Sequence, residues 1–253
     1  MSKLKNKVAV VTGGNSGIGF ATAKEFIEQG ASVVITGRNQ SAIDEAVKQL
    51  GENTTGILSN ASSVKDTENL VEKVKAKFGN VDILFVNAGV FYPTPIGQIT
   101  EDGFDEQMSI NFKGAIFTIE KFLPVLKDGA SIINLSSVNA YTGMPNTAVY
   151  AASKAALNSY TRTAATELAF RGIRVNAVNP GPVSTPIFSK SGLPEEMLTG
   201  FATALQNRIP LKRFGTPEDI AKLVSFLASD DASFITGAEY NIDGGINVNP
   251  LLS

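Results

Sequence analysis

The chain has 253 residues, with 22 Lys plus Arg against 24 Asp plus Glu and a formal net charge of −2. A charge so nearly balanced gives no overall attraction for nucleic acid or for an anionic membrane surface. The sequence contains neither histidine nor cysteine, which excludes Ser-His-Asp and Cys-His catalysis, HExxH metal sites and disulfides. No metal site is predicted, and any proton transfer must use Tyr, Lys, Asp or Glu.

Targeting and membrane signals are also missing from the sequence. No run of about 18 apolar residues occurs, so we expect no membrane-spanning segment. The apolar run near the N-terminus stops at Thr12, which is too short for a signal-peptide core. We therefore expect a cytoplasmic protein.

Short apolar, β-branched runs alternate with longer amphipathic stretches along the chain. We predict strands at 7–11, 31–36, 54–58, 81–86, 130–136, 173–179 and 238–243. Several of these runs are apolar on both faces, as expected for parallel strands covered by helices on either side. The amphipathic stretches predict helices, the first of which ends near Gly30, a residue type common at helix C-caps.

This alternation predicts an α/β fold of the Rossmann type, with a doubly wound, mostly parallel seven-stranded sheet and helices on both faces. A TIM barrel also alternates strand and helix, but it needs eight strands, one more than the candidates found. No Pro-rich or Gly/Ser-rich linker interrupts the series, so residues 1–253 are predicted to form one domain. A long irregular stretch late in the chain predicts a substrate lid at about 184–210.

The segment TGGNSGIG, residues 12–19, directly follows the first predicted strand. Its glycines lack the G-x-G-x-x-G spacing, yet a glycine turn between strand and helix directs backbone N–H groups toward a phosphate. The alternative is a plain βα turn without a ligand. We predict a dinucleotide site that includes Thr12, Gly13, Asn15, Ser16, Gly17, Ile18 and Gly19.

The end of the second predicted strand indicates which dinucleotide binds. NAD sites usually place a carboxylate there to bind the ribose 2′-hydroxyl, but no acid occurs between Ser32 and Gln40. Arg38 stands there instead, and a guanidinium pairs well with a phosphate. We therefore predict NADP(H) as the cofactor, with Arg38 on the 2′-phosphate.

A second cluster of polar residues carries the candidate chemistry. Tyr150 and Lys154 stand four apart on a predicted helix and share one face, and Ser136 and Ser137 end the strand before it. An ammonium one turn away is expected to lower the pKa of the tyrosine toward the working range. A serine hydroxyl could hold the substrate oxygen, so the set could move a proton without histidine.

Together these motifs resemble the short-chain dehydrogenase/reductase family over essentially the whole length. TGxxxGxG is the nucleotide motif of that family, and Asn87, Ala88 and Gly89 match its NAG motif. Ser137 lies 13 residues before Tyr150, the usual interval in the family, which favours it over Ser136. Two departures stand out, since Val86 replaces the first Asn of the Asn-Asn-Ala-Gly form and Asn60 replaces an adenine-binding Asp.

The resemblance implies residue roles. The catalytic residues would be Asn111, Ser137, Tyr150 and Lys154. Besides residues of the glycine loop, the cofactor would contact Arg38, Asn60, Asn87, Ala88, Gly89, Tyr150, Lys154, Pro180, Gly181, Val183 and Thr185. Hydride transfer would interconvert a ketone and a secondary alcohol, with Tyr150 giving or taking the proton.

The substrate and the partners are expectations of the same kind. An apolar or aromatic carbonyl compound is expected from the predicted lining, which comprises Phe91, Tyr92, Tyr141, Ile187, Phe188, Leu193, Met197, Leu198 and Phe201. One alternative is a 3-oxoacyl-acyl-carrier-protein reductase, with Lys121, Lys127, Arg171 and Arg174 as a candidate basic patch. Another is a non-catalytic NADP(H) sensor. The resemblance further implies a homotetramer.

Overall fold

The computed structural model describes residues 2–185 and 195–248, apart from the side chains at 195–199, 201 and 202. Its seven strands form one sheet in the order β3-β2-β1-β4-β5-β6-β7, and every neighbouring pair is parallel. The strands are β1 (Val8–Val11), β2 (Ser32–Gly37), β3 (Thr54–Leu58), β4 (Val81–Val86), β5 (Leu126–Leu135), β6 (Arg174–Pro180) and β7 (Glu239–Ile242). The predicted Rossmann sheet is confirmed, and the open strand order excludes a barrel.

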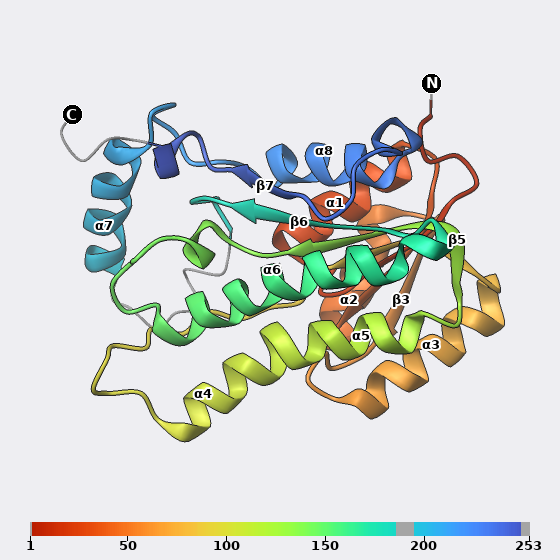
Figure 1. The fold of residues 1–253 in the computed structure, drawn as a ribbon, viewed down its shortest axis with the longest axis horizontal. Helices are drawn as coiled ribbons and strands as arrows, with labels where there is room; N and C mark the ends of the chain where they lie inside the picture. The colour runs from red at the N-terminus through yellow and green to blue at the C-terminus, as the bar shows by residue number, and fades with distance from the viewer. Residues whose placement is uncertain (1, 186–194, 249–253) are drawn as a thin grey trace.

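Helices cover both faces of the sheet (Figure 1). One face carries α1 (Gly17–Glu28), α2 (Gln40–Leu50) and α8 (Pro217–Ala228), whose apolar side chains join those of the strands in one core cluster. The other face carries α3 (Val64–Phe78), α5 (Gly114–Phe122) and α6 (Ala148–Leu168), which close a second cluster. Strands that are apolar on both sides need cover on both faces, so the sequence pattern explains this layering.

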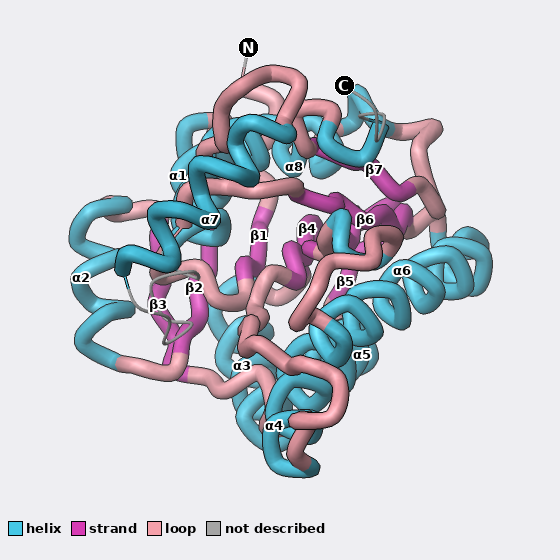
Figure 2. The backbone as a smooth tube through the Cα atoms, turned by 90° about the vertical axis from the view of Figure 1, so that its left-hand side faces the viewer, coloured by secondary structure: helices cyan, strands magenta, loops and turns pink. Residues whose placement is uncertain are grey.

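Two further helices lie toward the edge of the sheet where the strands end (Figures 1 and 2). Helix α4 (Glu101–Met108) runs into α5 through a π-helical turn at Ser109–Lys113. Helix α7 (Glu195–Arg208) falls within the segment predicted to form a lid. No helix within the described ranges is both long and apolar enough to cross a membrane.

The predicted boundaries differ clearly from the structure only at β5. This strand begins at Leu126 rather than at residue 130. Lys127, Asp128 and Gly129 are exposed, and the pairing with β4 shifts register between Val81 and Ile83. A charged pair followed by a glycine resembles a turn in sequence, but here it is an irregularity inside a strand. The helix end predicted near Gly30 is confirmed, because its φ is 92° and its N–H donates to Ile27.

The sheet order reverses between β1 and β4. The chain first moves outward from β1 to β2 and β3, and then returns to the other side of β1. In open α/β sheets, ligands bind outside the carboxyl ends of the strands at this kind of switch point. The glycine loop follows β1, Asn87 follows β4, Arg38 follows β2 and Ser137 comes just after β5. The predicted site residues therefore gather beyond the carboxyl ends of the strands.

Candidate active site

The glycine loop is held in a fixed shape by Asn87. The Asn87 side-chain amide donates to the carbonyl oxygens of Thr12 and Gly13, at 2.8 and 3.1 Å. The Thr12 hydroxyl in turn accepts from the backbone N–H groups of Asn87 and Ala88. Gly19 packs so closely that a Cβ there would lie 2.4 Å from the Gly13 oxygen. The motifs after β1 and β4 therefore form one unit.

The start of α1 suits a bound phosphate. Gly13 and Gly17 have φ values of 64° and 54°, which glycine adopts without strain. Ser16 precedes the helix, but its side chain makes no capping hydrogen bond, and the first turn contains no acidic residue. The first N–H groups of a helix have no intrahelical partner and attract anions. The residues present therefore fit the pyrophosphate of a dinucleotide.

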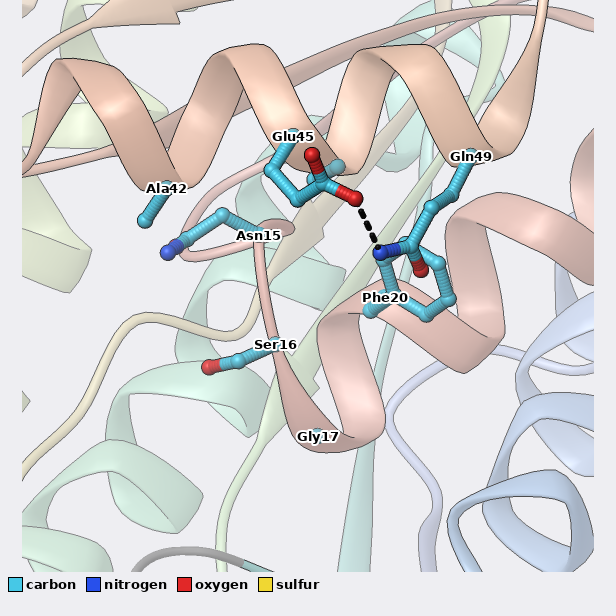
Figure 3. Close-up of a pocket in the computed structure, with 8 residues that line it drawn as sticks. Asn15, Ser16, Gly17, Phe20, Ala42, Glu45 and Gln49 are labelled. Carbon is cyan, nitrogen blue, oxygen red and sulfur yellow. Dashed lines mark hydrogen bonds between the residues drawn. The ribbon is translucent and has the colours of Figure 1, made fainter.

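A hollow of about 340 Å³ borders this loop on the side of α2 (Figure 3). Its lining residues are Asn15, Ser16, Gly17, Phe20, Ala42, Glu45, Ala46 and Gln49. The Asn15 side chain extends toward Ala42, and Gln49 donates to the Glu45 carboxylate at 2.9 Å. None of the candidate catalytic side chains lines this hollow. The hollow borders the glycine loop and lies apart from the candidate catalytic side chains.

Arg38 lies at the carboxyl end of β2, next to the glycine loop. The loop and the strand touch at Gly37, where a Cβ would lie 2.7 Å from the Asn15 side-chain oxygen. The first turn of α2, which follows Arg38, contains no acidic residue, and Asn39 caps it. The Arg38 side chain is exposed and lies near enough to Tyr92 to offset part of the rise that burial causes in the pKa of that hydroxyl. A phosphate beside Arg38 would therefore meet a guanidinium and a helix N-terminus.

The three main candidate catalytic side chains meet where β5 ends and α6 begins. Ser137 is buried, accepts a hydrogen bond from the Asn139 N–H at 3.1 Å, and lies near enough to Tyr150 to offset part of the rise that burial causes in the pKa of the tyrosine. Lys154 is 4% exposed, and its ammonium lies 5.8 Å from the centre of the Tyr150 ring. The same ammonium donates to the Leu135 carbonyl oxygen at 2.7 Å. The Ser136 hydroxyl instead donates to the backbone oxygen of Lys154, which leaves Ser137 as the serine beside the tyrosine.

Asn111 stands on the π-helical turn and joins this group. Its side chain exchanges two hydrogen bonds with the backbone of Val90 and donates a third to Ser153. A Cβ placed on Gly89 would lie 3.2 Å from the Asn111 Oδ1 and 3.6 Å from the Lys154 Nζ. The structure thus brings the NAG segment, Asn111 and Lys154 together. Single π turns in helices occur frequently at functional sites.

Comparison with known proteins decides the family. A family model described as enoyl-(acyl carrier protein) reductase matches residues 13–247. The 3-oxoacyl-acyl-carrier-protein reductase FabG of Thermotoga maritima is 39% identical over 249 residues, which cover 96% of this chain and 99% of that protein. A crystal structure described as short-chain dehydrogenase/reductase SDR: glucose/ribitol dehydrogenase, from Brucella melitensis, has a TM-score of 0.91 at 36% identity, covering 96% and 98% of the two chains. The chain belongs to the short-chain dehydrogenase/reductase family.

A second relative bears on the cofactor of this short-chain dehydrogenase/reductase. The NADP-dependent (R)-specific alcohol dehydrogenase of Lentilactobacillus kefiri is 36% identical over 250 residues, which cover 96% of this chain and 97% of that protein. Together the matches make this chain an oxidoreductase of the class that acts on CH–OH groups and binds a nicotinamide cofactor.

The expectation that Lys154 lowers the pKa of Tyr150 is wrong for this structure. Burial raises the pKa of Tyr150, and the nearby Ser137 hydroxyl offsets only part of that rise. Burial also lowers the pKa of Lys154 to about 8. Loss of water disfavours the charged form of both groups, and the ammonium is bonded to a backbone oxygen. The structure therefore favours the neutral, protonated form of Tyr150.

Asn60 is partly engaged in hydrogen bonds within its own turn. Its side-chain oxygen accepts from the backbone and the hydroxyl of Ser62, and its backbone N–H donates to Asp66. Because the Asn60 side-chain oxygen already accepts these hydrogen bonds, it does not replace the carboxylate of the missing Asp. Its amide N–H groups are the atoms left for an adenine ring.

The segment after β6 packs against the C-terminal strand. Pro180 ends β6, and Gly181 lies so near Asp243 that a Cβ there would be 2.7 Å away. Val183 is buried and pairs with Gly215, while Thr185 is the last described residue before the gap. Ile187, Phe188 and Leu193 lie outside the described residues, as do the side chains of Met197, Leu198 and Phe201.

Three aromatic residues were predicted to line the substrate pocket, and each has different neighbours in the structure. Phe91 meets the Tyr150 ring, with centroids 5.3 Å apart. Tyr92 donates its hydroxyl hydrogen to the Glu106 carboxylate at 3.1 Å and lies near Arg38. The Tyr141 hydroxyl accepts from the buried Asn158 and Asn179, and its ring borders a hollow of about 290 Å³ with C-terminal residues. Sequence reasoning missed these contacts because no local motif marks them.

Proposed function

We propose that this protein is an NADP(H)-dependent carbonyl reductase that interconverts a ketone and a secondary alcohol. The observation that carries the proposal is the meeting of Ser137, Tyr150 and Lys154 beside the NAG segment that holds the glycine loop. A bound nicotinamide would supply or accept the hydride. The side chains of this protein supply the proton and the geometry.

In the reducing direction, the Tyr150 Oη donates its proton to the carbonyl oxygen of the substrate. Ser137 donates a hydrogen bond to the same oxygen, because Asn139 fixes the position of its Oγ. The raised pKa of Tyr150 keeps the phenol protonated at neutral pH, as a proton donor requires. Lys154 and Asn111, whose polar atoms both lie close to Gly89, are proposed to line the route by which Tyr150 regains its proton.

NADP(H) rather than NAD(H) is supported by charge. Arg38 ends β2, no acid lies between Ser32 and Gln40, and the α2 N-terminus begins beside it. A 2′-phosphate would gain a bidentate guanidinium partner there. The proposed cofactor contacts are those predicted from the sequence, with the Asn60 amide N–H groups on the adenine.

An apolar or aromatic substrate is favoured by the Phe91 ring beside Tyr150. The matches to acyl-carrier-protein reductases keep an acyl-carrier-protein substrate as a second candidate. The four basic residues suggested for docking do not support it. Lys121, Lys127 and Arg171 are paired with Glu68, Asp82 and Asp128, and Arg174 is buried on backbone oxygens.

The location of two of these residues argues the same way. Lys127 and Arg174 lie at the amino ends of β5 and β6, whereas Ser137 follows the carboxyl end of β5. A basic patch at the amino ends of the strands would lie far from the proposed reaction site, which is at their carboxyl ends.

We further propose that the protein is a cytoplasmic homotetramer, because of the family resemblance described in the sequence analysis.

The test is a panel of aliphatic, aromatic and β-keto ester carbonyls, with loss of NADPH or NADH absorbance as the readout. We expect turnover with NADPH and a higher kcat/KM for NADPH than for NADH. A higher kcat/KM for NADH would overturn the cofactor assignment. No turnover of any compound, combined with tight NADPH binding, would favour a non-catalytic sensor.

A further inference from the structure

Helix α6, which carries Tyr150 and Lys154, is not capped by the residue that precedes it. The side chain of that residue, Thr147, makes no capping hydrogen bond, and its hydroxyl donates instead to the Met144 carbonyl oxygen at 2.8 Å. The first N–H groups of a helix have no partner within the helix and are costly to bury without one. Val149, the second residue of α6, is buried. Its N–H therefore needs an acceptor from elsewhere in the chain.

Thr94, in the segment between β4 and α4, supplies that acceptor. Its hydroxyl oxygen accepts from the Val149 N–H at 3.2 Å, at a position where an N-cap side chain commonly binds. The Thr94 N–H also donates to the Asn146 carbonyl oxygen at 2.7 Å, and Thr94 forms an isolated parallel bridge with Thr147. Thr94 and Thr147 are only 6% and 2% exposed. The start of α6 is thus capped from outside the helix, at a contact that little water reaches.

The same segment also contacts Tyr150 directly. The Phe91 ring, three residues before Thr94 in the chain, lies with its centroid 5.3 Å from that of the Tyr150 ring. Tyr150 follows Val149 and is the third residue of α6. The segment after β4 therefore meets the first turn of α6 at two adjacent residues. One contact holds the helix backbone, and the other holds the tyrosine ring.

The segment that carries Thr94 is itself held in place. Asn111 exchanges two hydrogen bonds with the backbone of Val90, at 2.8 and 2.9 Å. The Tyr92 N–H donates at 3.1 Å to the side chain of Gln107, which is fully buried. Because α4 and the π-helical turn fix this segment, the Thr94 hydroxyl has a defined position. A cap on a fixed segment determines where the helix begins.

We propose that Thr94 is a positioning residue for the proton transfer, which caps α6 and thereby sets the place of the Tyr150 hydroxyl. The inference rests on the proposed function, in which Tyr150 donates the proton. Thr94 acts through the α6 backbone, and its role needs no contact with substrate or cofactor. Without the cap, the first turn of α6 would shift Tyr150 relative to Ser137, and a small misplacement of a reacting group lowers the rate strongly.

The test compares the position of Tyr150 with the stability of the fold. Thr94→Val keeps the shape of the side chain but removes the hydroxyl, whereas Thr94→Ser keeps the hydroxyl. In Thr94→Val we expect faster hydrogen exchange at the Val149 amide and a kcat about 10-fold lower on the best compound of the carbonyl panel, with the Kd for NADPH unchanged. Thr94→Ser should restore the exchange rate and kcat to wild-type values. If Thr94→Val does not fold, Thr94→Ala takes its place with the same expectations, because it leaves room for water at the Val149 N–H.

Thr100→Val is the matched control, because Thr100 caps α4 by accepting from the Gly103 N–H at 3.2 Å, and α4 carries none of the candidate catalytic side chains. This variant should lower Tm by about 2–4 °C and leave kcat unchanged.

Three results would overturn the role of Thr94: wild-type exchange or kcat in Thr94→Val, no recovery in Thr94→Ser, or an equal loss of kcat in Thr100→Val. A wild type that reduces no carbonyl compound, although Thr94→Val speeds exchange at Val149, would instead overturn the proposed function, and this inference with it.

Discussion

The ring of Phe91 meets the ring of Tyr150 edge-on, with centroids 5.3 Å apart and planes at 81°. Phe91 follows the NAG segment, and Tyr150 lies near the start of α6, four residues before Lys154. Edge-to-face aromatic pairs are favourable and orient both rings. The contact therefore joins the segment after the NAG motif to Tyr150, the proposed proton donor, and covers part of a side chain whose pKa is raised by burial.

Removing this ring should alter the proton donor. In Phe91→Ala, water reaches the Tyr150 hydroxyl, so the pKa of Tyr150 should fall toward its ordinary value. Ketone reduction requires the protonated phenol, so the alkaline loss of kcat should move to lower pH. We also expect kcat at neutral pH to fall about 3–10-fold as the ring loses its orientation. The pH profile of kcat measures both effects.

Phe170→Ala is the control for this variant, because Phe170 is 85% exposed and lies beyond the end of α6. It should leave both kcat and the pH profile unchanged. A Phe91→Ala enzyme with the wild-type pH profile would contradict the role assigned to the aromatic contact.

The close packing of the glycine loop predicts the effect of a single methyl group. A Cβ at Gly19 would lie 2.4 Å from the Gly13 oxygen and 2.5 Å from the Asn87 amide. Gly19→Ala should therefore displace the loop and weaken NADPH binding by about 10-fold or more. Tryptophan is absent from the chain, so fluorescence of bound NADPH can report the affinity without indole background.

Gly143→Ala is the matched control, since no atom lies within 4 Å of a Cβ at that position. NADPH affinity and thermal stability should match those of the wild type in this variant. Equal affinity in Gly19→Ala and Gly143→Ala would show that the loop tolerates the methyl group, contrary to the packing described.

Burial of Lys154 predicts how stability depends on pH. The pKa of Lys154 falls from 10.5 to about 8 in the folded protein. Between these values the unfolded chain binds more protons, so this lysine makes the folded state more stable as pH rises. The gain amounts to about 3 kcal/mol across the window. Below the folded pKa, the buried charge opposes folding by the same amount.

Lys154→Met removes this dependence. The Tm of the variant should exceed the Tm of the wild type by the largest amount near pH 7, and this difference should disappear by about pH 10. Scanning calorimetry at the two pH values measures the difference, and Lys48→Met, at an exposed position on α2, controls for the loss of one charge. A Tm difference between wild type and Lys154→Met that does not change with pH would refute the burial effect.

The sequence was sufficient to predict what depends on local pattern. The parallel strands were predicted from their apolar runs. The four-residue spacing of Tyr150 and Lys154 predicted that both lie on one helix, as they do on α6. The boundary of β5 was wrong because Lys127, Asp128 and Gly129 resemble a turn, although they are an irregularity within the strand. Pattern cannot distinguish the two without the pairing partner.

What escaped prediction depends on tertiary arrangement. Tyr92 and Glu106 come from the segment after β4 and from α4, and only the fold brings them within hydrogen-bond distance. The direction of the Tyr150 pKa was missed for the same reason. Spacing shows that a lysine is near, but only the fold shows that both groups lose water and that the ammonium bonds Leu135.

The central claim is that Tyr150 transfers the proton in an NADPH-dependent carbonyl reduction. The most direct measurement is kcat of Tyr150→Phe on the best compound of the carbonyl panel, with NADPH affinity determined on the same sample. We predict that kcat falls by about 10² or more while the Kd for NADPH stays close to that of the wild type. Turnover near the wild-type rate in Tyr150→Phe would contradict the account.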